Sequence, residues 1–279
     1  MGRLSRCFHA LRTRGRKALV PFITAGDPGP EQTLVLMRAL VASGADILEL
    51  GVPFSDPMAD GPVIQRSSER ALRCGVTLRT VLDLVGEFRE SDTRTPIVLM
   101  GYLNPIEVMG YEVFARAAQR AGADGVLTVD MPPEEAHDLV KILGAHEIDP
   151  VFLLAPTSSE ERIARICGLA RGFVYYVSLK GVTGSDKLDT SAVADKLRLI
   201  RRHTALPIGV GFGIKDAESA ARIALISDAV VVGSALVSRI EALGNGPNLE
   251  RDMRAFMREL RGAMDGMGPG RVRESLCPP

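Results

Sequence analysis

One acidic residue lies where a soluble protein rarely places a charge. Glu49 sits within Ile47–Leu50, where its neighbours are apolar and the run is typical of a buried parallel strand. An unpaired charge there costs several kcal/mol, and burial raises the pKa of a carboxyl towards values that suit proton transfer near neutral pH. The pattern alone leaves two interpretations open: a general acid or base that faces a ligand, or a buried ion pair with an arginine or lysine.

A second carboxylate follows the same strand and is the candidate partner of the first. Asp60 ends the loop that comes after Gly51, just before Gly61 and Pro62. Proline suits the first position of a helix, so a helix is expected from Pro62. Without further context, Asp60 is better explained as the N-cap of that helix than as a functional group.

Three glycine-rich turns are expected beside one another at strand ends. They are Gly181–Gly184, Gly209–Gly213 and Gly233–Ser234. Glycine lets a ligand approach the backbone, and exposed N–H groups bind anions, especially at a helix N-terminus. Each turn alone is more often only a turn, but three on adjacent strands predict a phosphate site.

Other common catalytic and metal-binding patterns are missing from the sequence. The histidines lie in or beside predicted helices, so none is assigned a catalytic role. The glycine spacing differs from a dinucleotide fingerprint, and the cysteines are too scattered for a zinc site or a redox pair, which favours reduced thiols. The residues concerned are His9, His137, His146, His203, Cys7, Cys74, Cys167 and Cys277.

Alternating strands and helices must position these residues. The pattern predicts one (β/α)₈ barrel over residues 1–279, with a loose tail from about residue 266, and its active site at the carboxyl ends of the strands. A doubly wound open sheet is the alternative, because strand count cannot prove closure. The expected strands are 18–24, 46–51, 96–100, 124–129, 150–154, 173–177, 207–210 and 229–232.

Three helices carry specific expectations. Leu4, Phe8 and Leu11 form one stripe of an extra N-terminal helix before the first strand. One amphipathic helix is expected over residues 108–121. The segment Ser158–Glu161 has the pattern of a capping box and predicts a helix start there.

Composition and charge exclude some partners. The 279 residues carry 34 basic and 34 acidic side chains, so the formal net charge is zero. A nucleic-acid partner is not expected, because such binders carry excess positive charge to neutralise phosphates. No apolar run reaches the length of a membrane span, so no membrane association is expected and the cytoplasm is the expected location.

Sequence blocks along almost the whole chain resemble one family. Leu48–Pro57 followed by Ala59–Pro62 closely resembles a motif of the tryptophan synthase α subunit family and is long enough to be specific by itself. Further blocks fall in the family's order, whereas the extreme C-terminus and residues 185–194 look idiosyncratic. These blocks are Pro21–Pro28, Asn104–Pro105, Asp130–Glu134, Tyr175, Gly181–Gly184 and Gly211–Ile214.

The resemblance implies a barrel that cleaves indole-3-glycerol phosphate to indole and glyceraldehyde 3-phosphate, with no metal or organic cofactor in this chain. By position, Glu49 matches the general acid/base that protonates indole C3 and helps deprotonate the glycerol hydroxyl. Asp60 matches the carboxylate that interacts with the indole N–H. The implied phosphate site is Gly184, Gly213, Gly233 and Ser234. The implied indole and glycerol pocket is Phe22, Met100, Leu127, Tyr175, Thr183 and Phe212.

The resemblance also implies a partner. In that family a β subunit holding pyridoxal phosphate (PLP) joins the α subunit in an αββα heterotetramer, and indole passes directly between the two sites. Two other functions stay open: a stand-alone lyase that releases indole, and a non-catalytic barrel that activates a partner, which the two intact carboxylates disfavour. The expected partner-facing residues are Pro53, Asp56, Pro57, Asp130 and Pro132.

Overall fold

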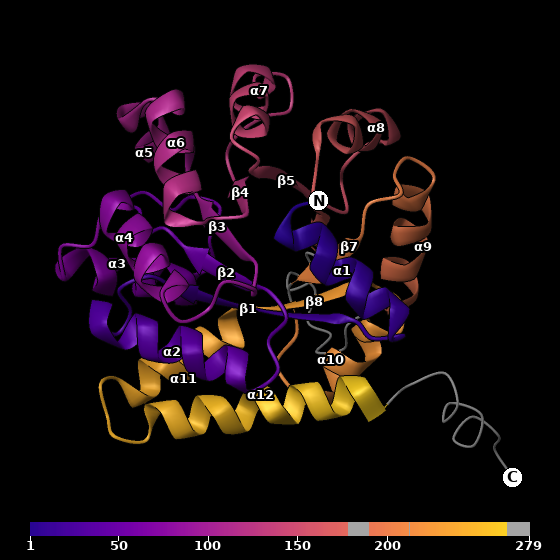
Figure 1. Cartoon of the computed structure of the whole chain (residues 1–279). Coiled ribbons are helices and arrows are strands. Elements are labelled where there is room, and N and C mark those ends of the chain that lie inside the picture. Colours follow the sequence, from indigo (N-terminus) through magenta and orange to yellow (C-terminus); the bar gives the residue numbers. More distant parts are fainter. Residues whose placement is uncertain (178–189, 212, 267–279) are drawn as a thin grey trace, which may run out of the picture.

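Eight parallel strands close into one barrel in the computed structural model, which describes residues 1–177, 190–211 and 213–266. The strands follow one another in chain order, and the first pairs with the last, with Ala18 opposite Ala229 (Figure 1). This closure confirms the barrel and excludes the open sheet. The strands are β1 (Ala18–Thr24), β2 (Leu48–Gly51), β3 (Ile97–Gly101), β4 (Gly125–Thr128), β5 (Asp149–Leu154), β6 (Val174–Val177), β7 (Ile208–Gly211) and β8 (Ala229–Val232).

Helices surround the barrel, and the long C-terminal helix packs against α2 and α10 (Figure 1). None of the described helices is long and apolar enough to cross a membrane. The helices are α1 (Arg3–Thr13), α2 (Pro30–Ala42), α3 (Pro62–Arg73), α4 (Leu78–Arg89), α5 (Leu103–Met109), α6 (Tyr111–Ala121), α7 (His137–Ala145), α8 (Glu160–Leu169), α9 (Thr190–Arg201), α10 (Ala217–Ala224), α11 (Ser234–Leu243) and α12 (Leu249–Gly266).

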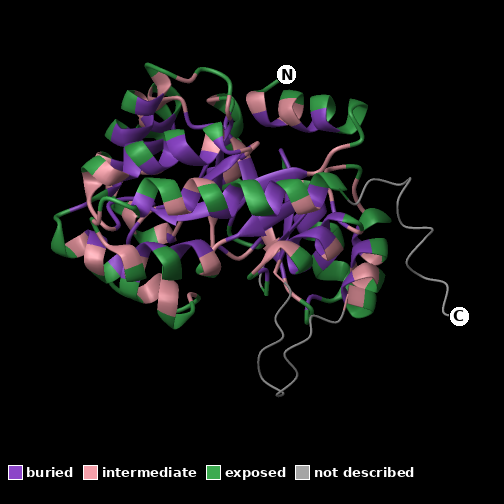
Figure 2. Cartoon of the chain, turned by 90° about the horizontal axis from the view of Figure 1, so that it is seen from below, coloured by how far each residue is buried: buried purple, intermediate pink, exposed green. Residues whose placement is uncertain are grey.

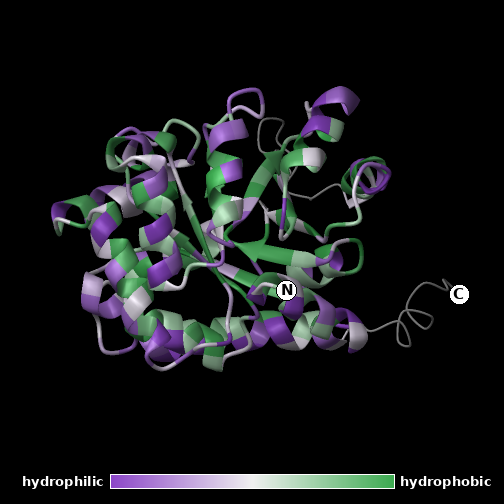
Figure 3. Cartoon of the chain, turned by 45° about the horizontal axis from the view of Figure 1, so that its top comes forward, coloured by the Kyte–Doolittle hydropathy of each residue, from purple (hydrophilic) through white to green (hydrophobic). Residues whose placement is uncertain are grey.

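The core has two parts because successive side chains of a strand point to opposite faces. Leu48 and Leu50 face the surrounding helices, whereas Ile47 and Val98 face the barrel interior. Figure 2 shows the buried strands inside a shell of helices with exposed outer faces, and Figure 3 shows the same contrast in hydropathy. The N-terminal helix α1 contributes to the interior cluster, with the ring of Phe8 centred 5.8 Å from that of Phe173.

Aspartates tie the starts of several strands to their neighbours. The carboxylate of Asp46 accepts the backbone N–H of Leu19 at 2.9 Å, and that of Asp124 accepts the N–H of Ile97 at 2.8 Å. Asp228 accepts the N–H that begins β7 at 2.9 Å. Each carboxylate also pairs with an arginine, which offsets part of its desolvation. These arginines are Arg261, Arg89 and Arg201.

Two local expectations are right only in part. The helix expected over residues 108–121 begins at Tyr111, and residues 103–109 form a separate helix because Gly110 has φ +85°, a conformation that breaks the α-helix and favours glycine. Helix α8 begins within Ser158–Glu161 as predicted, but its cap is Ser159, whose side chain accepts the N–H of Arg162, while the Ser158 hydroxyl accepts the N–H of Ala155. The predicted tail after residue 266 lies outside the described residues.

Candidate active site

A cavity of about 460 Å³ opens at the carboxyl ends of the strands. Side chains from six strands reach it: Phe22 of β1, Glu49 of β2, Met100 of β3, Leu153 of β5, Tyr175 of β6 and Val231 of β8. The strands therefore bring together residues that are far apart in the sequence, at the end of the barrel where ligands bind in this architecture.

Glu49 carries a buried carboxyl that no described residue neutralises. Its backbone lies between those of Phe22 and Val98, and the residue is only 1% exposed. Neither carboxyl oxygen has a hydrogen-bond partner among the described residues, and no ion pair forms there. Burial, and next the charge of Asp60, raise the pKa of Glu49 from 4.5 to about 8. The alternative of a buried ion pair is therefore wrong within the described part of the chain.

Asp60 faces the same cavity and is not the N-cap of α3. Gly61 occupies the N-cap position and makes no side-chain cap. Burial raises the pKa of Asp60, and a hydrogen bond that Tyr102 donates to Oδ2 at 3.0 Å acts in the opposite direction. Gln65 holds the backbone of the loop by donating to the Asp60 carbonyl oxygen at 2.9 Å.

Two aromatic rings in the cavity wall need glycine on the neighbouring strand. The ring of Phe22 lies over Gly51, where an added Cβ would come within 2.6 Å of Cζ, and Tyr175 lies over Gly211 in the same way. Burial and the charge of Glu49 raise the pKa of Tyr175, so its hydroxyl remains protonated. The glycines therefore allow rings to pack flat against the barrel wall beside the Glu49 carboxyl.

Part of the predicted phosphate site also lines this cavity. Gly213, with φ +77°, Gly233 and Ser234 all line the cavity. Gly233 is the N-cap residue of α11 and Ser234 is its first residue, so the N–H groups and dipole of this helix favour an anion. Gly184, Thr183 and Phe212 lie outside the described residues.

One predicted pocket residue lies deeper than expected. Leu127 is fully buried in the interior cluster and does not line the cavity, whereas Val129, two residues further along the strand direction, does. Sequence reasoning missed most of the wall, although the period-two pattern would have found Leu153, Val177 and Val231 within their strands and Val129 just after β4. The other lining residues that it missed are Ala59, Gly61, Ile64, Leu154, Ala155, Thr157, Ser158, Arg162 and Ile214.

The predicted partner-facing residues follow β2 and β4. Asp56 is exposed and accepts the Ser55 hydroxyl at 2.6 Å, while Pro53 is buried and Pro57 half-buried. Asp130 is exposed and accepts the backbone N–H that begins α5 at 2.8 Å, and Pro132 is half-buried.

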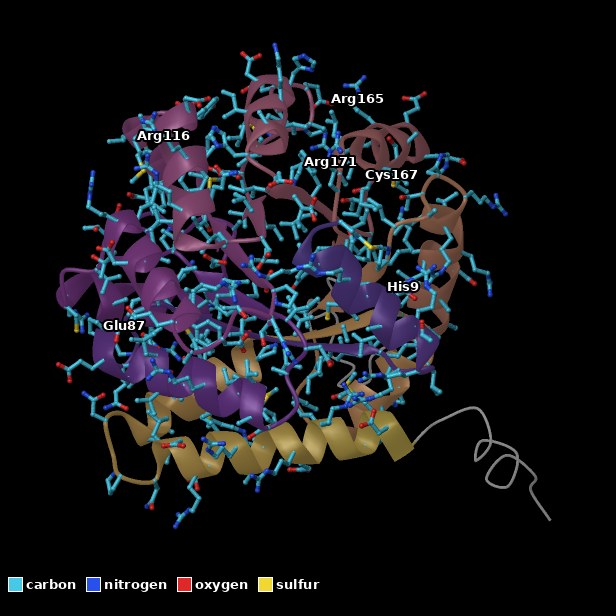
Figure 4. All side chains as sticks on the ribbon, in the orientation of Figure 1. His9, Glu87, Arg116, Arg165, Cys167 and Arg171 are labelled. Atoms are coloured by element: carbon cyan, nitrogen blue, oxygen red, sulfur yellow. The ribbon has the colours of Figure 1, made fainter. Side chains whose placement is uncertain are left out.

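None of the four histidines, all of which the structure describes, lines the cavity. His9 is exposed on α1, where Figure 4 labels it. His146 and His203 bind glutamates on neighbouring helices. Among the described residues, no group of three histidine, cysteine or acidic side chains could hold a metal ion. Among the described residues, the titratable side chains that line the cavity are those of Glu49, Asp60, Arg162 and Tyr175.

Comparison with known proteins agrees with this geometry. The family model described as tryptophan synthase alpha chain matches residues 8–265. The alpha chain of Thioalkalivibrio sulfidiphilus is 64% identical over 95% of this chain and 100% of its own length, and that of Alkalilimnicola ehrlichii is 57% identical over 96% and 98%. A crystal structure of the alpha subunit from Legionella pneumophila has a TM-score of 0.90 at 45% identity, covering 95% of this chain and 99% of its own. The chain belongs to the tryptophan synthase alpha chain family.

Proposed function

We propose that Glu49 and Asp60 perform the acid–base chemistry of the lyase reaction of this family. As a family member, the chain cleaves indole-3-glycerol phosphate to indole and glyceraldehyde 3-phosphate in tryptophan biosynthesis. The observation that carries the assignment is the Glu49 carboxyl, which is buried in the cavity with no partner among the described residues. A raised pKa of about 8 keeps this carboxyl protonated at neutral pH and ready to donate.

The reaction needs a proton at C3 of the indole ring before the carbon–carbon bond can break. Glu49 gives its proton to C3, which turns the ring into a cationic electron sink. The resulting carboxylate then takes the proton of the glycerol hydroxyl on the adjacent carbon. As that C–O bond becomes a carbonyl, the electron pair of the breaking carbon–carbon bond returns to the ring, and charge and protons balance.

Asp60 stabilises the intermediate cation from the other side of the ring. Its carboxylate accepts the indole N–H, where positive charge develops after C3 is protonated. Burial strengthens this interaction because there is less water to screen it. The two carboxyls therefore differ in environment: Glu49 is protonated at neutral pH, and Asp60 receives a hydrogen bond that lowers its pKa against burial.

The phosphate and the ring supply binding and orientation. The Gly213 backbone and the N-terminus of α11 at Gly233 and Ser234 bind the phosphate, together with Gly184. Phe22, Met100, Tyr175, Thr183 and Phe212 surround the indole and glycerol parts, and Val129 takes the place that was expected of Leu127.

Family membership implies a β-subunit partner. We infer that this partner carries PLP, that the assembly is an αββα heterotetramer in the cytoplasm, and that this chain needs no cofactor of its own. The contact would use Pro53, Asp56, Pro57, Asp130 and Pro132. Large exposed apolar side chains near both segments support that face, with Met58 85% exposed beside Pro57 and Val108 82% exposed on α5.

An indole-release assay tests the proposal. Purified chain is mixed with indole-3-glycerol phosphate, with and without a tryptophan synthase β subunit, and indole is quantified. We expect slow release alone and faster release with the partner. Full activity without any β-subunit binding would favour a stand-alone lyase, and substrate binding without product in the complex would favour a non-catalytic barrel.

A further inference from the structure

Tyr102 stands between a backbone amide and the Asp60 carboxylate. The N–H of Ala59 donates to the Tyr102 hydroxyl oxygen at 3.0 Å, and that hydroxyl lies 3.0 Å from Oδ2 of Asp60. A phenol has one proton to give. Since the amide occupies its acceptor side, the Tyr102 proton is directed at Asp60, and Asp60 Oδ2 must be the acceptor.

We propose that Tyr102 is a positioning residue that fixes the Asp60 carboxyl by its Oδ2 and leaves Oδ1 for the ring N–H of the substrate. This inference rests on the proposed function of Asp60. Among the described residues, no hydrogen bond or ion pair reaches Asp60 Oδ1, while Oδ2 accepts the hydrogen bond from the phenol. A carboxylate fixed by one oxygen has lost most of its rotational freedom before substrate arrives, so less entropy is lost on binding.

The protein holds Tyr102 from several sides. The residue is only 4% exposed, and its ring stacks on Phe54 with centroids 5.1 Å apart and planes at 27°. Tyr102 also occupies the N-cap position of α5, and Asp130 fixes the next residue by accepting the N–H of Leu103 at 2.8 Å. Packing and backbone hydrogen bonds therefore fix the position of the phenol independently of its hydrogen bond to Asp60.

The hydrogen bond from Tyr102 to Asp60 lies among other acidic groups. On β2, burial and the charge of Asp60 raise the pKa of Glu49. After β4, the charge of Asp130 adds to burial in raising the pKa of Tyr102. All of these groups are acidic. Among the described residues, the Tyr102 hydroxyl is the one group that lowers the pKa of Asp60 against burial.

The test replaces Tyr102 by phenylalanine, which keeps the stacked ring and removes the hydroxyl. We expect kcat for indole release in the α–β complex to fall about tenfold at neutral pH, since a hydrogen bond to a charged group is lost. The acid limb of the profile of kcat against pH should move to higher pH, so the difference in kcat between variant and parent should shrink as pH rises. KM should change little. The matched control is Tyr111→Phe, which removes a hydroxyl that donates to Glu107 at 2.6 Å on the outer surface.

Three outcomes separate the possibilities. A kcat that falls equally at all pH values, with a lower melting temperature, would show a merely structural role and overturn the inference. Activity of Tyr102→Phe equal to that of the parent and of Tyr111→Phe at every pH would also overturn it. The proposed function of Asp60 is tested separately by Asp60→Asn: if that variant keeps full activity, the proposal for Asp60 fails, whatever Tyr102→Phe shows.

Discussion

Glu49 and Asp60 face one cavity, and the negative charge of Asp60 adds to burial in raising the pKa of the Glu49 carboxyl to about 8. The two carboxyls therefore lie in different environments. Burial raises the pKa of both carboxyls, and within the described part of the chain only Asp60 receives a phenolic hydrogen bond that lowers its pKa against burial.

The first prediction concerns this coupling. Asp60→Asn removes the charge that disfavours ionisation of Glu49, so the pKa of Glu49 should fall while staying above its ordinary value because burial remains. Titration of a ¹³C-labelled Glu49 carboxyl by NMR measures this shift. The control Asp83→Asn removes an exposed charge on α4 and should leave the Glu49 titration unchanged. An equal shift in both variants would contradict the coupling.

The second prediction concerns stability against pH. The pKa of Glu49 is about 8 in the folded chain and 4.5 as an ordinary glutamate, so between these values the folded state holds a proton that the unfolded state has released. Stability from this group is therefore fully present below about pH 4.5 and falls by about 1.4 kcal/mol per pH unit until about pH 8.

Glu49→Gln should remove that slope, because glutamine does not titrate. Denaturant unfolding at about pH 5 and about pH 8 should show the variant gaining stability over the parent as pH rises. Glu87→Gln, on the outer face of α4 in Figure 4, is the matched control and should follow the parent. Parallel stability curves for Glu49→Gln and the parent would refute the raised pKa.

The third prediction uses the close approach of Phe22 to β2. Gly51→Ala places a Cβ within 2.6 Å of the Phe22 ring, which must swing towards the substrate. We expect a rise in KM of about tenfold or more, because the displaced Phe22 ring would occupy space that the indole ring of the substrate needs. Gly168→Ala in α8 meets nothing within 4 Å and should leave kinetics unchanged, with a gain of about 0.5–1 kcal/mol in stability. Equal KM values for the two variants would count against the assigned pocket.

The fourth prediction concerns the N-terminus of α11. Ser234→Asp puts a negative charge where the substrate phosphate is expected, so KM and the inhibition constant of inorganic phosphate should both rise about tenfold or more. The helix itself should not weaken, because an acidic residue suits its first turn. A melting temperature at or above that of the parent, with weakened phosphate inhibition, is the expected pair of results. Undiminished inhibition by inorganic phosphate would contradict a phosphate site at the N-terminus of α11.

Much of the fold follows from local patterns. The strand β1 occupies the predicted residues 18–24, and the other strands agree with prediction to within a residue or two at most ends. Buried parallel strands are short apolar runs between helices, so their positions are visible in one sequence. The depth of Leu127 was not predictable, because the height of each strand in the barrel depends on its stagger against its neighbours.

The roles of the site residues were harder to predict than their places. Glu49 stood out as a charge in an apolar run, but only the structure could show that no described cation meets it. The contact between Tyr102 and Asp60 joins residues 42 apart in the chain and leaves no periodic signal. The break at Gly110 depends on a single backbone angle, and glycine inside a helical pattern is compatible with either outcome.

The most direct test of the central claim is the rate of indole release by Glu49→Gln in the α–β complex. General acid–base catalysis contributes about 10²–10⁴-fold, so we expect kcat to fall by at least about 100-fold while substrate still binds. Glu87→Gln should release indole at the parental rate. Indole release by Glu49→Gln at that same rate would contradict the role of Glu49 as the proton donor.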